Sequence, residues 1–252
     1  MAPVSGCADG RGKGTVAGNG NGNSKGKGKA TGRPVALVYR GPESLAGCPE
    51  AAARLVESAP RPFRAVFCGP DEDTALTPET LRTAALYVQP GGGDLDPAWR
   101  AMRRYAADIR GFVRGGGGYL GICLGGYLAG NAPGFGLLAH DTDEYTARPH
   151  AAVRDTDDTV VKVRWRGRNR TMYFQDGPYF VPGPGDQVLA TYDDVDGDVC
   201  AAMVARFGAG RVGVVGPHPE ADRGWYEDQG LTNPDGIRFD LGYDLLRTTV
   251  PG

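Results

Sequence analysis

The chain has 252 residues, of which 40% are hydrophobic and 23% are charged, and its formal net charge is −2. This length holds one large α/β domain or two small ones. The sequence lacks an apolar run near the roughly 18–20 residues of a membrane span and lacks the apolar core of a secretory signal, so we expect a cytoplasmic protein with no membrane partner.

The spacing of the cysteines also favours a cytoplasmic protein. They stand at the scattered positions Cys7, Cys48, Cys68, Cys123 and Cys200. They form neither a C-x-x-C pair nor a small-domain disulfide framework, which fits a reducing environment. Cys48, Cys68 and Cys200 lie in or near apolar segments, where a cysteine is more typically a small core residue than part of a site.

The first 33 residues differ from the rest in composition. They are rich in Gly, Asn, Lys and Ser and hold almost no apolar side chain, so we expect a disordered tail followed by one domain over residues 34–252. Residues 1–34 carry six Lys or Arg and one Asp, so the remainder of the chain is acidic. An acidic body argues against nucleic acid as the main partner.

The first half of the domain alternates between apolar runs and helical patterns. The expected strands cover residues 34–39, 63–68, 85–88 and 119–122, and the expected helices cover residues 47–58, a short segment starting at Thr77, and 98–114. Thr77 and Pro78 have the residue types of an N-cap and a first helical position. Strands that alternate with helices predict a parallel sheet with helices on both faces.

The second half is richer in strands. A hairpin is expected from residues 160–165 and 171–174 around a turn at Gly167–Asn169, with further strands at 187–192, 199–207 and 211–215 and a terminal helix at 236–249. The hairpin and its neighbours predict an antiparallel section added to the parallel sheet.

One stretch has the pattern of a catalytic turn. Gly121-Ile122-Cys123-Leu124-Gly125 follows the G-x-C-x-G pattern, the cysteine form of a nucleophile elbow between a strand and a helix. Glycines are needed where the chain packs against a nucleophile at sparsely allowed backbone angles. The N-terminal N–H groups of the following helix favour the thiolate. Taken alone, the pattern fits a buried cysteine in a Gly-rich turn equally well.

His218 and Glu220 supply the partners that a cysteine nucleophile needs. His218 directly follows the buried strand at 211–215, and ligands of open α/β sheets bind beyond such strand ends. Glu220 can orient the imidazole, which then takes the thiol proton, as in a catalytic triad. The alternative is a loop histidine between two prolines. The placement of Cys123 and His218 at separate strand ends favours the triad.

The glycine run at 91–93 predicts an oxyanion hole. Backbone N–H groups of Gly92 and Gly93 can turn inward there, and the N–H of Leu124 is the expected second donor. Asp94 either holds a substrate ammonium group or caps the next helix. Gln175, Asp176 and Tyr179 either line the pocket or form an ordinary Asp-Gly-Pro turn. His218 and Glu220 lack another His or Cys at ligand spacing, so no metal site is expected.

These motifs together resemble the class I glutamine amidotransferase-like superfamily, in the order Cys, His, Glu. A closer resemblance is to the domain at the N-terminus of eukaryotic biotin–protein ligases and to its stand-alone bacterial relatives. The similar segments are Val38–Pro42, Gly91–Leu95, Gly121–Gly125 and Asp176–Phe180. The resemblance spans roughly residues 34–247. It implies a flavodoxin-like three-layer α/β sandwich, a mostly parallel central sheet and a triad of Cys123, His218 and Glu220.

The sequence departs from glutaminases of that class at Tyr127, which stands where they carry Gln, four residues after the nucleophile. We therefore predict a cysteine-dependent amide hydrolase or acyl or amido transferase that acts on a small-molecule amide or ester, glutamine or another. No cofactor is expected, and the missing synthetase domain is compatible with a partner enzyme that receives ammonia or the acyl group. The alternative is a non-catalytic ligand-binding or regulatory module that retains the pocket, with Tyr127 among its lining residues.

Overall fold

The computed structural model describes residues 32–131, 133–193 and 199–250. The predicted tail, residues 1–33, lies outside the described residues except for its last two positions. From Arg33 onward the described residues form one compact unit.

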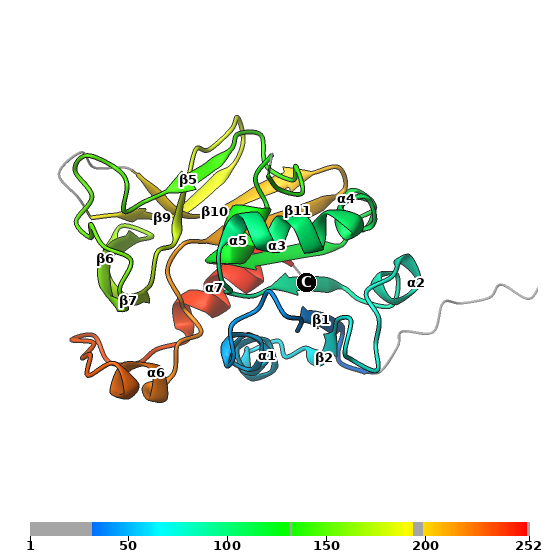
Figure 1. The fold of residues 1–252 in the computed structure, drawn as a ribbon, viewed down its shortest axis with the longest axis horizontal. Coiled ribbons are helices and arrows are strands. Elements are labelled where there is room, and N and C mark those ends of the chain that lie inside the picture. Colours follow the sequence, from blue (N-terminus) through cyan, green and yellow to red (C-terminus); the bar gives the residue numbers. More distant parts are fainter. Residues whose placement is uncertain (1–31, 132, 194–198, 251–252) are drawn as a thin grey trace, which may run out of the picture. The chain divides into compact units, whose positions relative to one another are not determined.

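Five parallel strands form one half of an 11-stranded sheet (Figure 1). In sheet order they are β2 (Arg64–Cys68), β1 (Val35–Tyr39), β3 (Leu86–Gln89), β4 (Gly118–Ile122) and β11 (Gly210–Val215). All residues of β3 and β4 are buried. The apolar runs at β3 and β4 therefore form strands covered on both faces, whereas β2, at the edge of the sheet, is only partly buried.

The other strands continue the sheet in antiparallel pairing. They are β10 (Cys200–Phe207), β9 (Gln187–Tyr192), β6 (Thr159–Trp165) and β7 (Arg168–Phe174), with β8 (Pro178–Phe180) and β5 (Thr142–Glu144) paired beside β10. The prediction of a mostly parallel sheet is thus confirmed only in part, for the five strands from β2 to β11 at one end of the sheet. The hairpin turns at Arg166 and Gly167, which both have positive φ, rather than at Gly167–Asn169, because a two-residue type I′ turn matches the strand twist.

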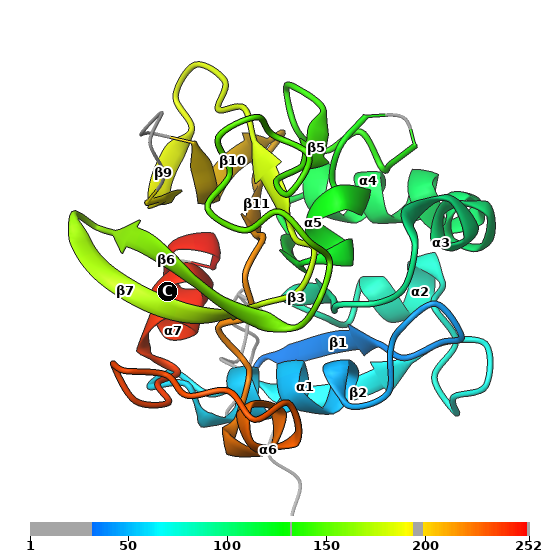
Figure 2. The same cartoon turned by 60° about the vertical axis from the view of Figure 1, so that its left-hand side comes forward.

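Helices cover both faces of the parallel half (Figures 1 and 2). On one face lie α1 (Cys48–Ser58) and α7 (Asp240–Thr249), and on the other lie α2 (Pro78–Leu81), α3 (Leu95–Met102), α4 (Ala106–Arg114) and α5 (Leu124–Leu128). The remaining helix, α6 (Arg223–Asp228), follows β11. Thr77 caps α2 with a capping box, as expected. The single helix predicted over 98–114 is divided by a 3₁₀ turn at Arg103–Tyr105.

This topology gathers three loops at one edge of the sheet. β4 lies between β3 and β11, and all three run parallel. Their carboxyl ends lead into the glycine run at 91–93, into Cys123 and into His218, respectively. Among the described residues, none of the helices has both the length and the apolar character required to cross a membrane.

Gly125 fixes how closely α5 approaches β3. A Cβ at this position would lie 2.0 Å from the Gln89 carbonyl oxygen. Gly125→Ala is therefore expected to lower the free energy of unfolding by about 1–3 kcal/mol, measured by chemical denaturation, because backbone must move. The control Gly111→Ala in α4 meets nothing within 4 Å and should stabilise the fold by roughly 0.5–1 kcal/mol. Equal stability of the two variants would contradict this packing.

Candidate active site

Cys123 lies at the sharp junction between β4 and α5. Its backbone has φ 49° and ψ −108°, a conformation that costs a non-glycine residue about 1–3 kcal/mol and persists only where the surroundings enforce it. The Cys123 N–H donates to the Val215 carbonyl at 2.9 Å, and the thiol donates to the Gln175 carbonyl at 3.5 Å. α5 has only 5 residues, so its dipole contributes less than the sequence led us to expect.

His218 and Glu220 form a buried pair beyond β11. Their side chains are 4% and 0% exposed, and Nδ1 of His218 lies 2.9 Å from Oε1 of Glu220. The backbone N–H of His218 donates to the backbone carbonyl of Tyr173 at 2.9 Å, and this bond fixes the loop after β11 against β7. The carboxylate thus sets the orientation of the ring and leaves Nε2 for another partner.

The surroundings of His218 favour its protonated form. Burial alone would lower the pKa of His218, but the negative charge of Glu220 and the charge and hydrogen bond of Cys123 outweigh it and raise that pKa to about 10. The structure therefore brings Cys123, His218 and Glu220 together in the order thiol, imidazole and carboxylate.

The three glycines at 91–93 lie in three different environments. A Cβ on Gly91 would lie 2.9 Å from Cε1 of His218, so only glycine lets the imidazole sit there. The Gly93 N–H donates to the Glu43 carbonyl at 3.3 Å, and the prediction that it faces an oxyanion is corrected by this bond. Gly92 and Leu124 both line the space beside Cys123.

Cys123 opens onto two adjoining hollows. The imidazole hollow, of about 490 Å³, is lined by His218 and also by Cys48, Asp158, Tyr173 and Trp225. The carboxylate hollow, of about 370 Å³, is lined by Leu124 and also by Asp94, Asp143, Glu144 and Asp176. Gly92 and Gln175 border both. Each volume suits a small molecule or one substituent of it.

Comparison with known proteins agrees with this architecture. Residues 36–149 match the family model described as "Biotin-protein ligase, N terminal". The biotin–protein ligase of Schizosaccharomyces pombe is 27% identical over an alignment of 162 residues, and the alignment covers 55% of this chain and 26% of that protein. Residues 36–149 are thus similar to the N-terminal domain of biotin–protein ligases. It spans only about a quarter of the length of the curated relative.

Solved structures show the fold of this domain in glutamine amidotransferases. PurLQS from Thermotoga maritima aligns with TM-score 0.57 and 18% identity over 86% of this chain and 97% of that one. A structure titled glutamine amidotransferase aligns with TM-score 0.54 and 19% identity over 78% and 99%. The match to the biotin–protein ligase N-terminal family ends at residue 149. It includes Cys123, whereas His218 and Glu220 are assigned by geometry alone.

Most of the pocket residues predicted from the sequence lie at the hollows. Asp94 is the N-cap residue of α3, but its side chain makes no capping hydrogen bond. The Tyr127 hydroxyl donates to the Asp176 carbonyl at 3.1 Å. Tyr179 lines neither hollow. Its ring lies 4.7 Å from the Arg148 guanidinium. Side chains alternate between the two faces of β8, so Tyr179 points to the opposite face from Pro178 and Phe180.

Several lining residues were missed from the sequence. Cys48 is buried, as predicted, yet it borders the same hollow as Cys123. The Trp225 ring lies 5.2 Å from the His218 ring and 5.3 Å from the Tyr173 ring. Nothing local marks Trp225 or Tyr173, since only the fold brings α6 and β7 to His218. Among the described residues, no three His, Cys, Asp or Glu side chains are grouped as a metal site.

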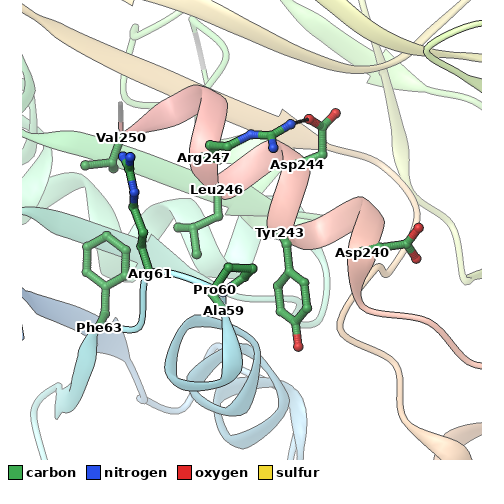
Figure 3. A pocket seen from close by; sticks show the side chains of 10 residues that line it. All are labelled: Ala59, Pro60, Arg61, Phe63, Asp240, Tyr243, Asp244, Leu246, Arg247 and Val250. Atoms are coloured by element: carbon green, nitrogen blue, oxygen red, sulfur yellow. Dashed lines mark hydrogen bonds and ion pairs between the residues drawn. The ribbon is translucent and has the colours of Figure 1, made fainter. Parts of the chain in front are cut away.

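A separate hollow lies between α7 and the loop that precedes β2 (Figure 3). It has a volume of about 330 Å³ and no thiol or imidazole on its walls. Arg247 donates to Asp244 at 2.7 Å, and Asp244 also accepts from Trp165 and Arg166. Asp240, the other carboxylate on these walls, accepts from Arg238 at 3.2 Å. Both carboxylates therefore already have arginine partners.

The raised pKa of His218 depends on Glu220. Glu220→Gln should lower the pKa of His218 far below about 10, because burial then opposes the charged ring with less compensation. The titration is followed through the imidazole NMR resonances across the neutral and alkaline range, with His218→Gln for assignment. Glu227→Gln, which changes an exposed carboxylate on α6, is the control. An unchanged titration would show that Glu220 does not set the charge of His218.

The same pKa has a consequence for stability. His218 has a higher pKa in the folded chain than its ordinary value of 6.5. Its protonation therefore stabilises the fold fully below about pH 6.5, and this contribution disappears as the pH rises towards 10. Chemical denaturation of the wild type against His218→Gln should show a stability difference that shrinks over this range. A difference that grows with pH would contradict the assignment.

Proposed function

We propose that this domain is a cysteine-dependent amide hydrolase or acyl or amido transferase. The observation that supports it best is the juxtaposition of Cys123 with a buried, Glu220-paired His218 of raised pKa. An imidazole beside the sulfur can take the thiol proton and so generate the nucleophilic thiolate. The family relative is a ligase and the structural neighbours include amidotransferases by title, so enzymatic activity is the natural expectation.

In the first half-reaction, the Cys123 sulfur attacks the carbonyl carbon of an amide or ester. The C–S bond forms as the carbonyl π electrons move onto oxygen, and the N–H groups of Gly92 and Leu124 stabilise the oxyanion. The oxyanion then collapses, the C–N or C–O bond breaks, and His218 gives its proton to the leaving group. A thioester on Cys123 and an amine or alcohol result.

In the second half-reaction, His218 removes a proton from water or from another acceptor as that molecule attacks the thioester carbon. The C–S bond breaks, and the imidazolium faces the thiolate again. Glu220 keeps the ring in one orientation through both halves. These steps use only side chains, backbone amides and the acceptor. A partner enzyme can supply that acceptor or consume the released ammonia.

Tyr127 bears on which amide is used. It occupies the position of the glutaminase Gln, and its hydroxyl is engaged by the Asp176 carbonyl. The proposal therefore extends to substrates other than glutamine. A non-catalytic module would keep the same hollows without turnover, and the experiment below distinguishes the two.

The reactive thiol is tested by competitive alkylation. Limiting iodoacetamide followed by peptide mass spectrometry should label Cys123 before Cys48, Cys68 and Cys200, of which Cys68 and Cys200 lie in the core. Burial raises the pKa of Cys200 to about 12 and that of Cys68 to about 12, so both should stay unlabelled. Equal labelling of all four would exclude a special thiol at Cys123.

Turnover is tested with para-nitrophenyl acetate as an activated acyl donor. The wild type should form an acetyl thioester on Cys123, detected by intact mass. Cys123→Ala should form none, and His218→Ala should slow turnover by roughly 10²–10⁴-fold through loss of the acid and base. Glu79→Gln on the exposed α2 surface is the matched control. Ester turnover that survives Cys123→Ala would contradict the mechanism and favour the non-catalytic alternative.

A further inference from the structure

The acidic side chains around Cys123 far outnumber the cationic ones, and the carboxylate hollow is lined by carboxylates without any cationic side chain among the described residues. Six carboxylates line the two hollows, and no Lys or Arg lines either of them among the residues that the structure describes. They are Asp94, Asp143, Glu144, Asp176, Asp158 and Asp228. We infer that the substrate carries an ammonium or guanidinium group and that the carboxylate hollow binds it. This inference rests on the proposed function and names its substrate class.

The position of the carboxylate hollow, more than its acidity, makes it part of the substrate site. It is bounded by the Cys123 side chain, Gly92 and Leu124, the groups assigned to attack and to oxyanion binding. A molecule that presents its carbonyl to the sulfur must place one substituent in this space. Whatever occupies it then contacts Asp176 and Glu144 at close range.

The four carboxylates of this hollow have no cation of their own. Every ion pair among the described residues uses other acidic side chains. The Thr146 hydroxyl lies 2.8 Å from Oε1 of Glu144 and 3.1 Å from Oδ1 of Asp176. One hydroxyl hydrogen cannot satisfy both. Burial raises the pKa of Asp176, and the charges of Glu144 and Asp94 add to it, so a bound cation would relieve this repulsion.

The imidazole hollow is less suited to a cation. Its Asp158 already accepts a hydrogen bond from the Tyr173 hydroxyl at 2.6 Å, and Asp228 is exposed at the rim. The protonated His218 ring also faces this space. A carboxylate or phosphate substituent would find no fixed cation in the carboxylate hollow. The charge pattern therefore assigns the positive substituent to that hollow.

Two methanethiosulfonate reagents of similar size test this directly. The 2-aminoethyl reagent is cationic and the 2-sulfonatoethyl reagent is anionic. In each, the Cys123 thiolate forms an S–S bond to the sulfenyl sulfur and methanesulfinate leaves. The rate at which each reagent modifies Cys123 is measured by peptide mass spectrometry. It is divided by the rate at which the same reagent modifies a free small thiol, which corrects for the reagent's intrinsic reactivity. The wild type should favour the cationic reagent by roughly tenfold or more, and high salt should shrink the preference.

Variants that replace a carboxylate by its amide show which residues cause the preference for the cationic reagent. Glu144→Gln and Asp176→Asn, singly and combined, should reduce the cationic preference towards that of the free thiol. Each keeps a side-chain oxygen for Thr146, and Asn tolerates the positive φ of 46° at position 176. Glu79→Gln removes an exposed carboxylate far along the chain and should leave the preference unchanged. Thermal unfolding of each variant verifies that it folds.

The outcomes separate the two proposals. If Cys123 reacts readily but equally with both reagents, or if its preference survives the double variant, the cationic subsite is wrong while the reactive thiol stands. If neither reagent labels Cys123, the proposed nucleophile is wrong and the inference that rests on it is overturned as well. A preference that the double variant abolishes and Glu79→Gln retains supports the subsite.

Discussion

The left-handed backbone at Cys123 is the constraint on which the site depends. A cysteine at φ 49° is held there because its N–H is bonded to Val215 and because glycine at 125 lets α5 lie against the end of β3. These two contacts tie the nucleophile to both neighbouring strands of the parallel sheet. The strain cost of about 1–3 kcal/mol is met by the packing of the sheet edge, so the sulfur position is a property of the fold as a whole.

The pair His218–Glu220 places a second demand on the fold. Both side chains are almost fully buried, and removing one partner of such a pair typically costs about 3–5 kcal/mol because a charge is left uncompensated. A well-packed apolar pair would be a simpler way to stabilise this position. The retention of a buried carboxylate that raises the imidazole pKa is understandable if the charge of His218, rather than stability, is what the site requires.

The sequence was sufficient to predict strands and site residues wherever a short stretch of neighbouring residues carries the pattern. Apolar runs located β1, β3, β4 and β11, and the residues that follow two of these strands include the three side chains of the proposed triad, which the structure brings together. It was insufficient where distant segments meet. The bridge between Ser44 and Gly92 turns the Gly93 N–H towards Glu43. β5 is three residues long and is paired only with β8, so no periodicity marked Asp143 and Glu144. Trp225 reaches His218 only through the path of the chain after β11.

Tyr127 connects Cys123 to the acidic wall of the carboxylate hollow. It stands one turn after Cys123 on α5, and its hydroxyl holds the Asp176 carbonyl, next to the Gln175 carbonyl that accepts from the thiol. One side chain therefore fixes the turn that bounds both hollows. If Cys123 is the nucleophile that we propose, its position is set by the strand ends, whereas the acidic wall beside it is positioned by the turn that Tyr127 holds in place.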